Sequence, residues 1–247
     1  MELDKIFTLI LEGGEVAGKL ELVKISLDKA REFAEKEFAK QGKELKEEMP
    51  EFNKRFKIAQ TKAGKGKTLR KDMPVIEEKD IKLFQTALSE GHIDLNKPYA
   101  KTTNKKDPFP EGLSMKKAQE WLKNGLKDGS ISDDKIEVDM KKIKVEELKP
   151  IQKQIYFDKA MKATAKFGIE GTTKFLKNTF FVASFDKYII DGHHRFLSGL
   201  LVDPKMEVQV LTIDLSSKKL VELSKAFGDA IGNKRNQWIN SGHLKHF

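Results

Sequence analysis

Apolar positions at helical spacing mark several segments of the chain. Phe33 and Phe38 fall on one face of a predicted helix that Ser26 is placed to cap and that Pro50 limits. We interpret this phenylalanine stripe as core packing, because apolar helical periodicity usually marks a buried face. The same spacing predicts further helices at residues 78–90, 114–126, 157–167 and 216–227.

Shorter apolar or alternating runs predict β-strands. In the clearest case Val208, Val210 and Thr212 alternate with their neighbours, so at least one face of that strand is apolar. Prolines and glycines leave residues 92–112 irregular. The predicted strands are residues 19–25, 141–145, 180–183, 188–190 and 208–213. This mixture of strands and helices predicts an α+β (mixed α/β) fold.

Residues 188–195, Tyr-Ile-Ile-Asp-Gly-His-His-Arg, combine the end of an apolar strand with a polar cluster. Gly192 permits a sharp turn, and the apolar residues from Phe196 onward have the spacing of a helix that begins there. A helix start, the fixed charge of Arg195 and two imidazoles make this junction a candidate receptor for phosphate.

The segment Gly129-Ser130-Ile131-Ser132-Asp133 is the best candidate for a domain boundary. We therefore predict a mostly helical N-terminal region with a basic loop at residues 1–132, the loop being the basic stretch between Asn53 and Lys71, and a separate module at residues 133–247.

The charge balance points to a polyanionic partner. The chain carries 47 basic and 38 acidic side chains, a formal charge of +9, and has no acidic residue between Asn53 and Lys71. Such a stretch can neutralise several phosphates of a nucleic acid, although a solvated surface of a lysine-rich protein would look the same. The candidate nucleic-acid contacts are Lys54, Arg55, Lys57, Lys62, Lys65, Lys67, Arg70 and Lys71.

Several classes of protein are not expected. No run of about eighteen apolar residues suggests a membrane span, and the N-terminal sequence does not resemble a secretory signal. The absence of Cys excludes disulfides and thiolate metal sites. These features together predict a cytoplasmic protein.

Gly64-Lys65-Gly66-Lys67-Thr68 partly matches a phosphate-binding P-loop. However, Thr61 stands where that motif requires glycine, and the residues before it make a poor strand. We interpret the segment as a basic loop that contacts phosphates without sequence specificity.

The Asp-Gly-His-His-Arg string at residues 191–195 resembles the signature of the ParB/sulfiredoxin superfamily, and the resemblance extends from about Ile143 to about Leu215. It implies a ParB/sulfiredoxin-like C-terminal module beside the basic N-terminal region. As a stand-alone protein with this motif, the chain resembles proteins encoded by large bacteriophages. This resemblance implies that the protein is located in the cytoplasm of a bacterial host.

Members of this superfamily differ in chemistry. ParB hydrolyses CTP and clamps DNA, and other relatives are kinases of free serine, ATP-dependent sulfiredoxins or nucleases. Sulfiredoxin chemistry is excluded because His193 stands where those enzymes place their Cys. The kinases place a catalytic Glu where this chain has Gln152, so a kinase would need another base, such as Glu146, Glu147 or Asp158.

The candidate catalytic residues are Asp191, His193 and His194. Each imidazole is open to three interpretations: proton transfer or phosphate binding, structural hydrogen bonding, and metal ligation. No metal-ligand set is assigned, although Asp191 is a candidate ligand for Mg²⁺ bound to phosphates. The candidate nucleotide-binding residues are Gly192, Arg195, Gln152, Gln154, Thr172, Lys234 and Arg235. For Thr172, capping of a structural element is the preferred interpretation.

The leading hypothesis is a ParB-like protein that binds ATP, ADP or CTP and acts on DNA or a DNA component by phosphoryl transfer or phosphodiester hydrolysis. One alternative is an ATP- or ADP-dependent kinase of a small metabolite. The other is a non-enzymatic DNA-binding or virion-associated protein whose motif is a structural relic. The sequence does not indicate an oligomeric state.

Overall fold

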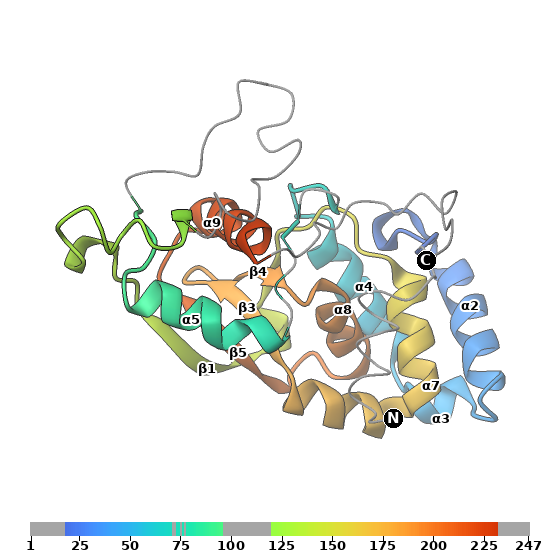
Figure 1. The fold of residues 1–247 in the computed structure, drawn as a ribbon. Coiled ribbons are helices and arrows are strands. Elements are labelled where there is room, and N and C mark those ends of the chain that lie inside the picture. Colours follow the sequence, from blue (N-terminus) through green and yellow to red (C-terminus); the bar gives the residue numbers. More distant parts are fainter. Residues whose placement is uncertain (1–17, 71–72, 75, 77, 96–119, 232–247) are drawn as a thin grey trace, which may run out of the picture. The chain divides into compact units, whose positions relative to one another are not determined.

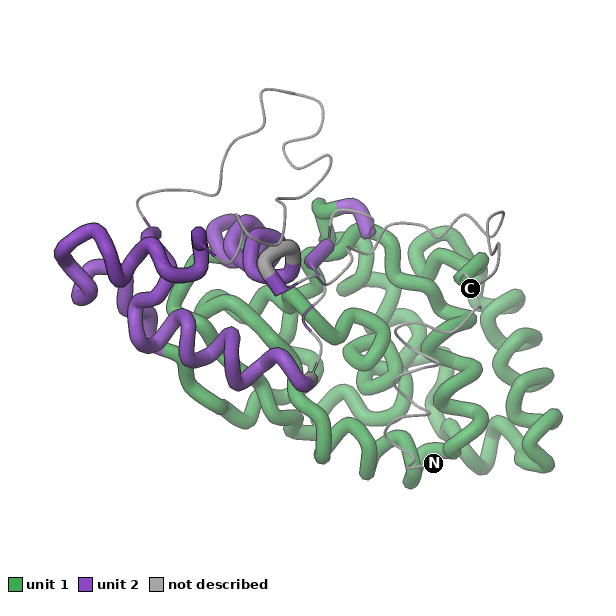
Figure 2. The backbone as a smooth tube through the Cα atoms, viewed as in Figure 1, with its two compact units in different colours: residues 1–68, 138–217 green, residues 69–137, 218–247 purple. Residues whose placement is uncertain are grey.

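A computed structural model of the chain describes residues 18–70, 73–74, 76, 78–95 and 120–231 (Figure 1). The chain forms two compact units, each assembled from two separate segments (Figure 2). Unit 1 contains residues 1–68 and 138–217, and unit 2 contains residues 69–137 and 218–247.

Unit 1 is built on a five-stranded mixed sheet with strand order β1-β5-β3-β4-β2. The strands are β1 (Val138–Lys144), β2 (Lys149–Pro150), β3 (Phe180–Ser184), β4 (Tyr188–Asp191) and β5 (Glu207–Ile213). β3 runs parallel to β5 and antiparallel to β4, whereas β2 runs parallel to β4. β3 is buried from Phe181 to Ser184. Its continuous apolar run is what a strand covered on both faces requires.

The helices of unit 1 pack around one aromatic cluster. Phe157 contacts Phe33, Phe52 and Phe56 at ring-centroid distances of 6.0, 6.5 and 5.6 Å, each in an edge-on arrangement. These contacts join two helices from the N-terminal part of the described chain to the helix that follows β2. The elements are η2 (Leu22–Lys24), α2 (Leu27–Ala39), α3 (Leu45–Glu48), α4 (Phe52–Ala63), η6 (Val145–Glu147), α7 (Phe157–Asn178) and α8 (His193–Val202).

α7 changes direction at Gly168, where φ is 72°. The helix restarts at once, and the main-chain N–H of Ile169 donates a hydrogen bond of 3.0 Å to Glu48 Oε2. Glu48 therefore acts as an acceptor for the second half of α7, as a capping side chain does at a helix start. The predicted helix 157–167 is confirmed, but it continues past the break because Phe175 and Leu176 are buried.

Unit 2 contains η4 (Glu78–Asp80), α5 (Ile81–Ser89), η5 (Ser132–Asp134) and α9 (Ser217–Ala230), whose first residue belongs to unit 1. Phe84 of α5 and Phe227 of α9 are both buried, and their ring centroids lie 4.6 Å apart. This contact brings together the two segments of unit 2, which are far apart in the sequence.

The mixed α/β class is confirmed, but two local predictions are wrong. Residues 19–25 do not form a strand, because Glu21 makes only an isolated bridge to Tyr156 before the chain turns into η2. The basic segment is not a loop throughout, because α4 runs to Ala63 with Phe56 and Ala59 buried on one face. Residues 114–119 of the predicted helix 114–126 lie outside the described residues, and in the described part the helix ends at Trp121 and turns follow.

The predicted division of the chain at residues 132 and 133 stays a prediction. The compact units are interleaved along the sequence, since α2 and α4 belong with α7 and α8 in unit 1. Within the described part of the chain, no helix combines the length and apolar character needed to cross a membrane.

Candidate functional site

The turn between β4 and α8 has a backbone geometry that requires glycine. Gly192 has φ = 102°, a left-handed conformation, and is the N-cap residue of α8. A Cβ atom on this residue would lie 2.7 Å from Phe181 Cδ1, so a side chain would also collide with β3. The strand–turn–helix setting predicted for the motif is therefore present in the structure.

Arg195 is held across this turn by Asp191. Its Nη2 atom donates to Asp191 Oδ2, and the guanidinium lies 5.7 Å from the centroid of the Phe181 ring. The side chain of Arg195 is 8% exposed and that of Asp191 is 23% exposed. Since the carboxylate already neutralises the guanidinium, an anion at this turn would share Arg195 with Asp191.

His193 binds the main chain of the segment that follows β2. Its Nε2 atom accepts hydrogen bonds from the main-chain N–H groups of Ile151 and Gln152, at 3.2 and 3.0 Å. A nitrogen that accepts these bonds carries no proton in this arrangement. The imidazole is only 4% exposed. This geometry defines a structural role for His193, and the predicted catalytic role stays a prediction that competes with it.

His194 makes the equivalent contact a few residues further along. Its Nε2 atom accepts from the main-chain N–H of Tyr156 at 3.3 Å. The imidazole of His194 and the phenol ring of Tyr156 are nearly parallel, and their centroids lie 6.3 Å apart. The two neighbouring histidines of α8 therefore bind the same segment at different places, His193 before Gln154 and His194 after it.

The same segment also holds the basic loop. The main-chain N–H groups of Lys67 and Thr68 both donate to Ile151 O at 2.9 Å, and the N–H of Lys153 donates to Thr68 O at 2.7 Å. A Cβ atom on Gly66 would overlap the carbonyl group of Gln152. The structure therefore brings both the Gly64–Thr68 loop and the motif turn into hydrogen-bonding contact with one short stretch of chain.

Gly64–Thr68 is not a P-loop, in agreement with the prediction from the sequence. A P-loop follows a strand and leads into a helix, whereas this loop follows α4 and pairs through Thr68 with Gln152. Lys65 and Lys67 remain exposed on it.

The other predicted nucleic-acid contacts lie in different surroundings. Lys57 is exposed on α4, Lys54 is exposed and 3.5 Å from Glu51, and Arg55 is half-buried. Arg70 belongs to unit 2, and Lys71 lies outside the described residues.

The side chain of Lys62 contacts η6 of unit 1. Its Nζ atom donates to the carbonyl oxygen of Glu146. Burial lowers the pKa of Lys62, and the nearby charges of Lys65 and Lys149 act in the same direction. The ammonium group therefore fixes α4 against η6 and is less available to a nucleic acid.

The remaining predicted nucleotide-binding residues are placed as follows. Gln152 is 3% exposed and donates from Nε2 to Gln154 O, so it lies inside the segment that His193 holds. Thr172 is fully buried within α7, and its Oγ1 atom has no hydrogen-bond partner among the described residues. It lies inside α7 and does not cap an element, and its nucleotide-binding role stays a prediction. Lys234 and Arg235 lie outside the described residues.

Two of the alternative bases for a kinase are engaged elsewhere. Asp158 is 3% exposed, and its carboxylate accepts the main-chain N–H groups of Lys19 and Leu20 at 3.1 and 3.3 Å. A hydrogen bond from Lys187 lowers the pKa of Glu147, which makes that carboxylate a weaker base.

Sequence reasoning missed Tyr156 and Lys153 as parts of this site. Neither belongs to the Asp-Gly-His-His-Arg string, and their main-chain contacts to His194 and Thr68 leave no pattern in residue types.

Comparisons with protein-family models, with curated proteins and with solved structures find no match for this chain.

Proposed function

We propose that unit 1 is a ParB/sulfiredoxin-like module that binds the phosphate groups of a nucleotide, ATP, ADP or CTP, beside the Asp191–Arg195 turn. The proposal rests on the motif and on its strand–turn–helix setting at the start of α8. The positive end of a helix dipole at such a turn favours an anion.

The observation that carries the proposal is the docking of the Gly64–Thr68 loop onto Ile151–Lys153. Two features that suggest phosphate binding independently, the basic loop and the motif, meet on one hydrogen-bonded stretch of chain. Exposed Lys65 and Lys67 supply cationic side chains that a phosphate can reach without displacing a buried partner.

The residues of the turn then have distinct tasks. His193 and His194 position the segment 151–156, and Arg195 offers a charge held in a fixed direction by Asp191. Asp191 is the one carboxylate of the motif and remains partly exposed, which fits a role as a ligand for Mg²⁺ bound to the nucleotide.

An action on DNA or a DNA component follows from the charge of the same unit. Exposed lysines on α4 and on the docked loop extend the basic surface beyond what one nucleotide needs. Phosphoryl transfer or phosphodiester hydrolysis is the corresponding chemistry. A kinase of a small metabolite is supported less well, because Asp158 and Glu147 are already committed to other contacts.

Calorimetry with ATP, ADP and CTP, with and without Mg²⁺, tests the nucleotide site. We expect the full-length chain to bind at least one nucleotide, and the double substitution Lys65→Ala and Lys67→Ala to weaken binding about tenfold or more, since each removes a charge-assisted contact. Lys174→Ala, which changes an exposed lysine of α7, is the matched control. If none of the three nucleotides releases or absorbs heat, the nucleotide proposal is wrong.

A second candidate is a non-enzymatic DNA-binding protein in which the motif is structural. The burial of the three motif side chains favours it, since His193, His194 and Arg195 are only 4%, 7% and 7% exposed. This candidate predicts no nucleotide binding but an affinity for duplex DNA that falls steeply with salt, because phosphate contacts release counterions. The nucleotide calorimetry separates this candidate from the first, and a salt series on the wild type and on Lys57→Ala tests the affinity for DNA.

A further inference from the structure

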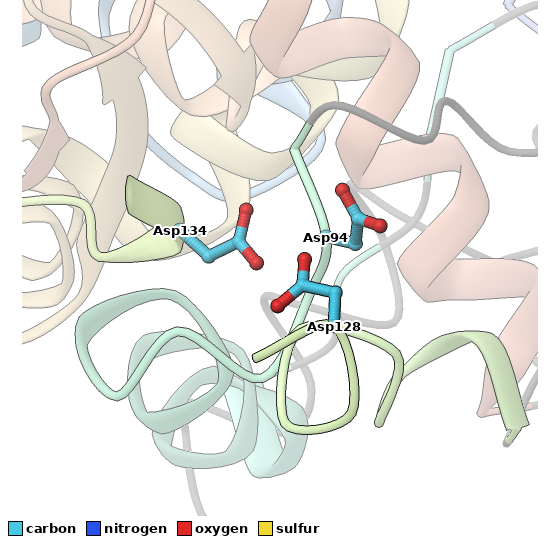
Figure 3. Close-up of side chains that lie close together, drawn as sticks. All are labelled: Asp94, Asp128 and Asp134. Carbon is cyan, nitrogen blue, oxygen red and sulfur yellow. The ribbon is translucent and has the colours of Figure 1, made fainter. Parts of the chain in front are cut away.

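Three aspartates of unit 2 come together from two separate parts of the sequence. Asp94 lies in the segment after α5, Asp128 precedes the turn at Gly129, and Asp134 ends η5. One carboxylate oxygen from each forms a group in which all three atoms lie within 4.8 Å of one another. Figure 3 shows the carboxylates of Asp128 and Asp134 facing each other, with Asp94 beside them.

Two of these carboxylates are removed from solvent. Asp94 is 2% exposed and Asp134 is 1% exposed, whereas Asp128 is exposed. Asp134 Oδ1 accepts the main-chain N–H of Leu95 at 2.7 Å. Its Oδ2 atom is buried and has no hydrogen-bond partner among the residues that the structure describes. An anionic oxygen in that position is costly unless a cation or a proton binds it.

The surroundings of Asp134 are electrostatically unfavourable for a bare carboxylate. Burial raises the pKa of Asp134, and the carboxylates of Asp128, Asp94 and Asp133 raise it further against the opposing effect of the Leu95 hydrogen bond. In the described part of the chain, neither Asp128 nor Asp134 forms an ion pair with a basic side chain. A bound cation would remove this imbalance.

We propose that Asp94, Asp128 and Asp134 bind a divalent cation, with Ca²⁺ as the best fit. Hard cations of this kind bind carboxylate oxygens, and opposite ligands of Ca²⁺ lie about 4.6–5.2 Å apart, against roughly 4.0–4.2 Å for Mg²⁺. The three carboxylate oxygens lie within 4.8 Å of one another, which is compatible with the ligand separations of Ca²⁺. Ca²⁺ accepts irregular ligand sets completed by water and main-chain carbonyl groups, whereas Mg²⁺ requires a nearly ideal octahedron.

The arrangement also explains how an ion could reach the site and what it would do there. Asp128 is exposed, so an ion can reach the buried pair from solvent through it. Once bound, the ion would join the segment that follows α5 to the 128–134 loop. It would stabilise unit 2, because the folded chain would bind the ion more tightly than the unfolded chain does. This site is independent of the nucleotide site proposed for unit 1.

The test uses the full-length chain after treatment with EDTA and dialysis. We expect calorimetry to show binding of CaCl₂ and thermal unfolding to shift upward with added Ca²⁺. Asp128→Asn and Asp134→Asn should each weaken Ca²⁺ binding by roughly 10- to 100-fold, a range known for perturbed metal sites. Asp214→Asn, which changes an exposed aspartate outside the cluster, should bind Ca²⁺ like the wild type.

The exposed variant keeps the test decisive even if substitution of the buried Asp134 disturbs folding. Asp128 is exposed, so Asp128→Asn is expected to fold normally, which circular dichroism will check. Without metal, Asp134→Asn should unfold at a higher temperature than the wild type, because it removes a buried charge among like charges. Wild-type protein that binds neither Ca²⁺ nor Mg²⁺, or an Asp128→Asn variant that binds Ca²⁺ unchanged, would overturn the proposal.

Discussion

Gly66 passes so close to Gln152 that the two main chains leave no room for a side chain between them. This contact lies at the centre of the docked loop, between the hydrogen bonds of Lys67 and Thr68 to Ile151 and the exposed lysines proposed to bind phosphate. The position of the basic loop therefore depends on a residue that carries no charge.

Gly66→Ala should displace the loop from Ile151–Lys153. We expect a loss of about 1–3 kcal/mol in the free energy of unfolding, as for other overpacked sites, measured by urea denaturation. Nucleotide binding should fall with it. Gly64→Ala is the control, because a Cβ atom there meets only ordinary contacts at 3.6 Å and the backbone is right-handed. Equal stability of the two variants would contradict the docked arrangement.

His193→Ala should destabilise unit 1 by about 1–3 kcal/mol, because two main-chain N–H groups lose their acceptor. His193→Gln retains an acceptor oxygen but cannot exchange protons near neutral pH. We expect it to recover part of the stability and the nucleotide binding. Binding calorimetry and urea denaturation of both variants provide the measurement. A glutamine variant that is stable and binds nucleotide but loses all turnover would instead establish proton transfer by the imidazole.

Glu48→Ala should destabilise the second half of α7, since the N–H of Ile169 loses its acceptor at the helix restart. The expected loss is about 0.5–2 kcal/mol, the usual range for a missing cap. Thermal unfolding of Glu48→Ala is compared with that of Glu47→Ala, which changes the exposed neighbouring glutamate. The same melting temperature for both would show that Glu48 does not cap α7.

Lys62 should make stability depend on pH above neutrality. Burial lowers the pKa of Lys62 in the folded protein below its ordinary value of 10.5. At pH values between the folded pKa and 10.5, the unfolded chain therefore binds more protons than the folded chain. The contribution of Lys62 to the free energy of unfolding therefore rises with pH in that window. Relative to Lys62→Met, the wild type should gain up to about 1 kcal/mol, a small effect because the side chain is only half-buried.

Urea denaturation of both proteins at a series of pH values from neutral to about 10 measures this difference. Lys57→Met, at an exposed position of the same helix, is the control and should show no such trend relative to the wild type. A difference for Lys62→Met that stays constant across the series would show that its surroundings do not disfavour the charge.

The parts of the fold with strong apolar periodicity could be predicted from the sequence. The strands around Val182 and Val210 and the helices that carry Phe38 and Phe84 are where the pattern places them. α4 was not predicted, although Phe52, Phe56, Ala59 and Ala63 recur at helical spacing and are buried, because basic side chains fill half of the positions between them. The apolar positions were the reliable signal, since burial rather than charge decides helical structure in a packed unit.

The candidate site was predictable only in its location. The motif indicated the strand–turn–helix junction, but the acceptor roles of His193 and His194 depend on main-chain atoms of residues 151–156, whose positions no residue type encodes. The acidic cluster of unit 2 was missed for a similar reason. Asp94 and Asp134 are brought together by tertiary structure, and their separation in the sequence matches no metal-binding spacing.

The interleaved composition of unit 1 has a consequence for synthesis on the ribosome. α2 and α4 are made long before α7 and α8, against which they pack. At about 5–20 residues per second, the nascent chain presents Phe38 and Phe56 unburied for on the order of ten seconds. Newly made protein should therefore depend on chaperones that shield these apolar side chains until the later helices emerge.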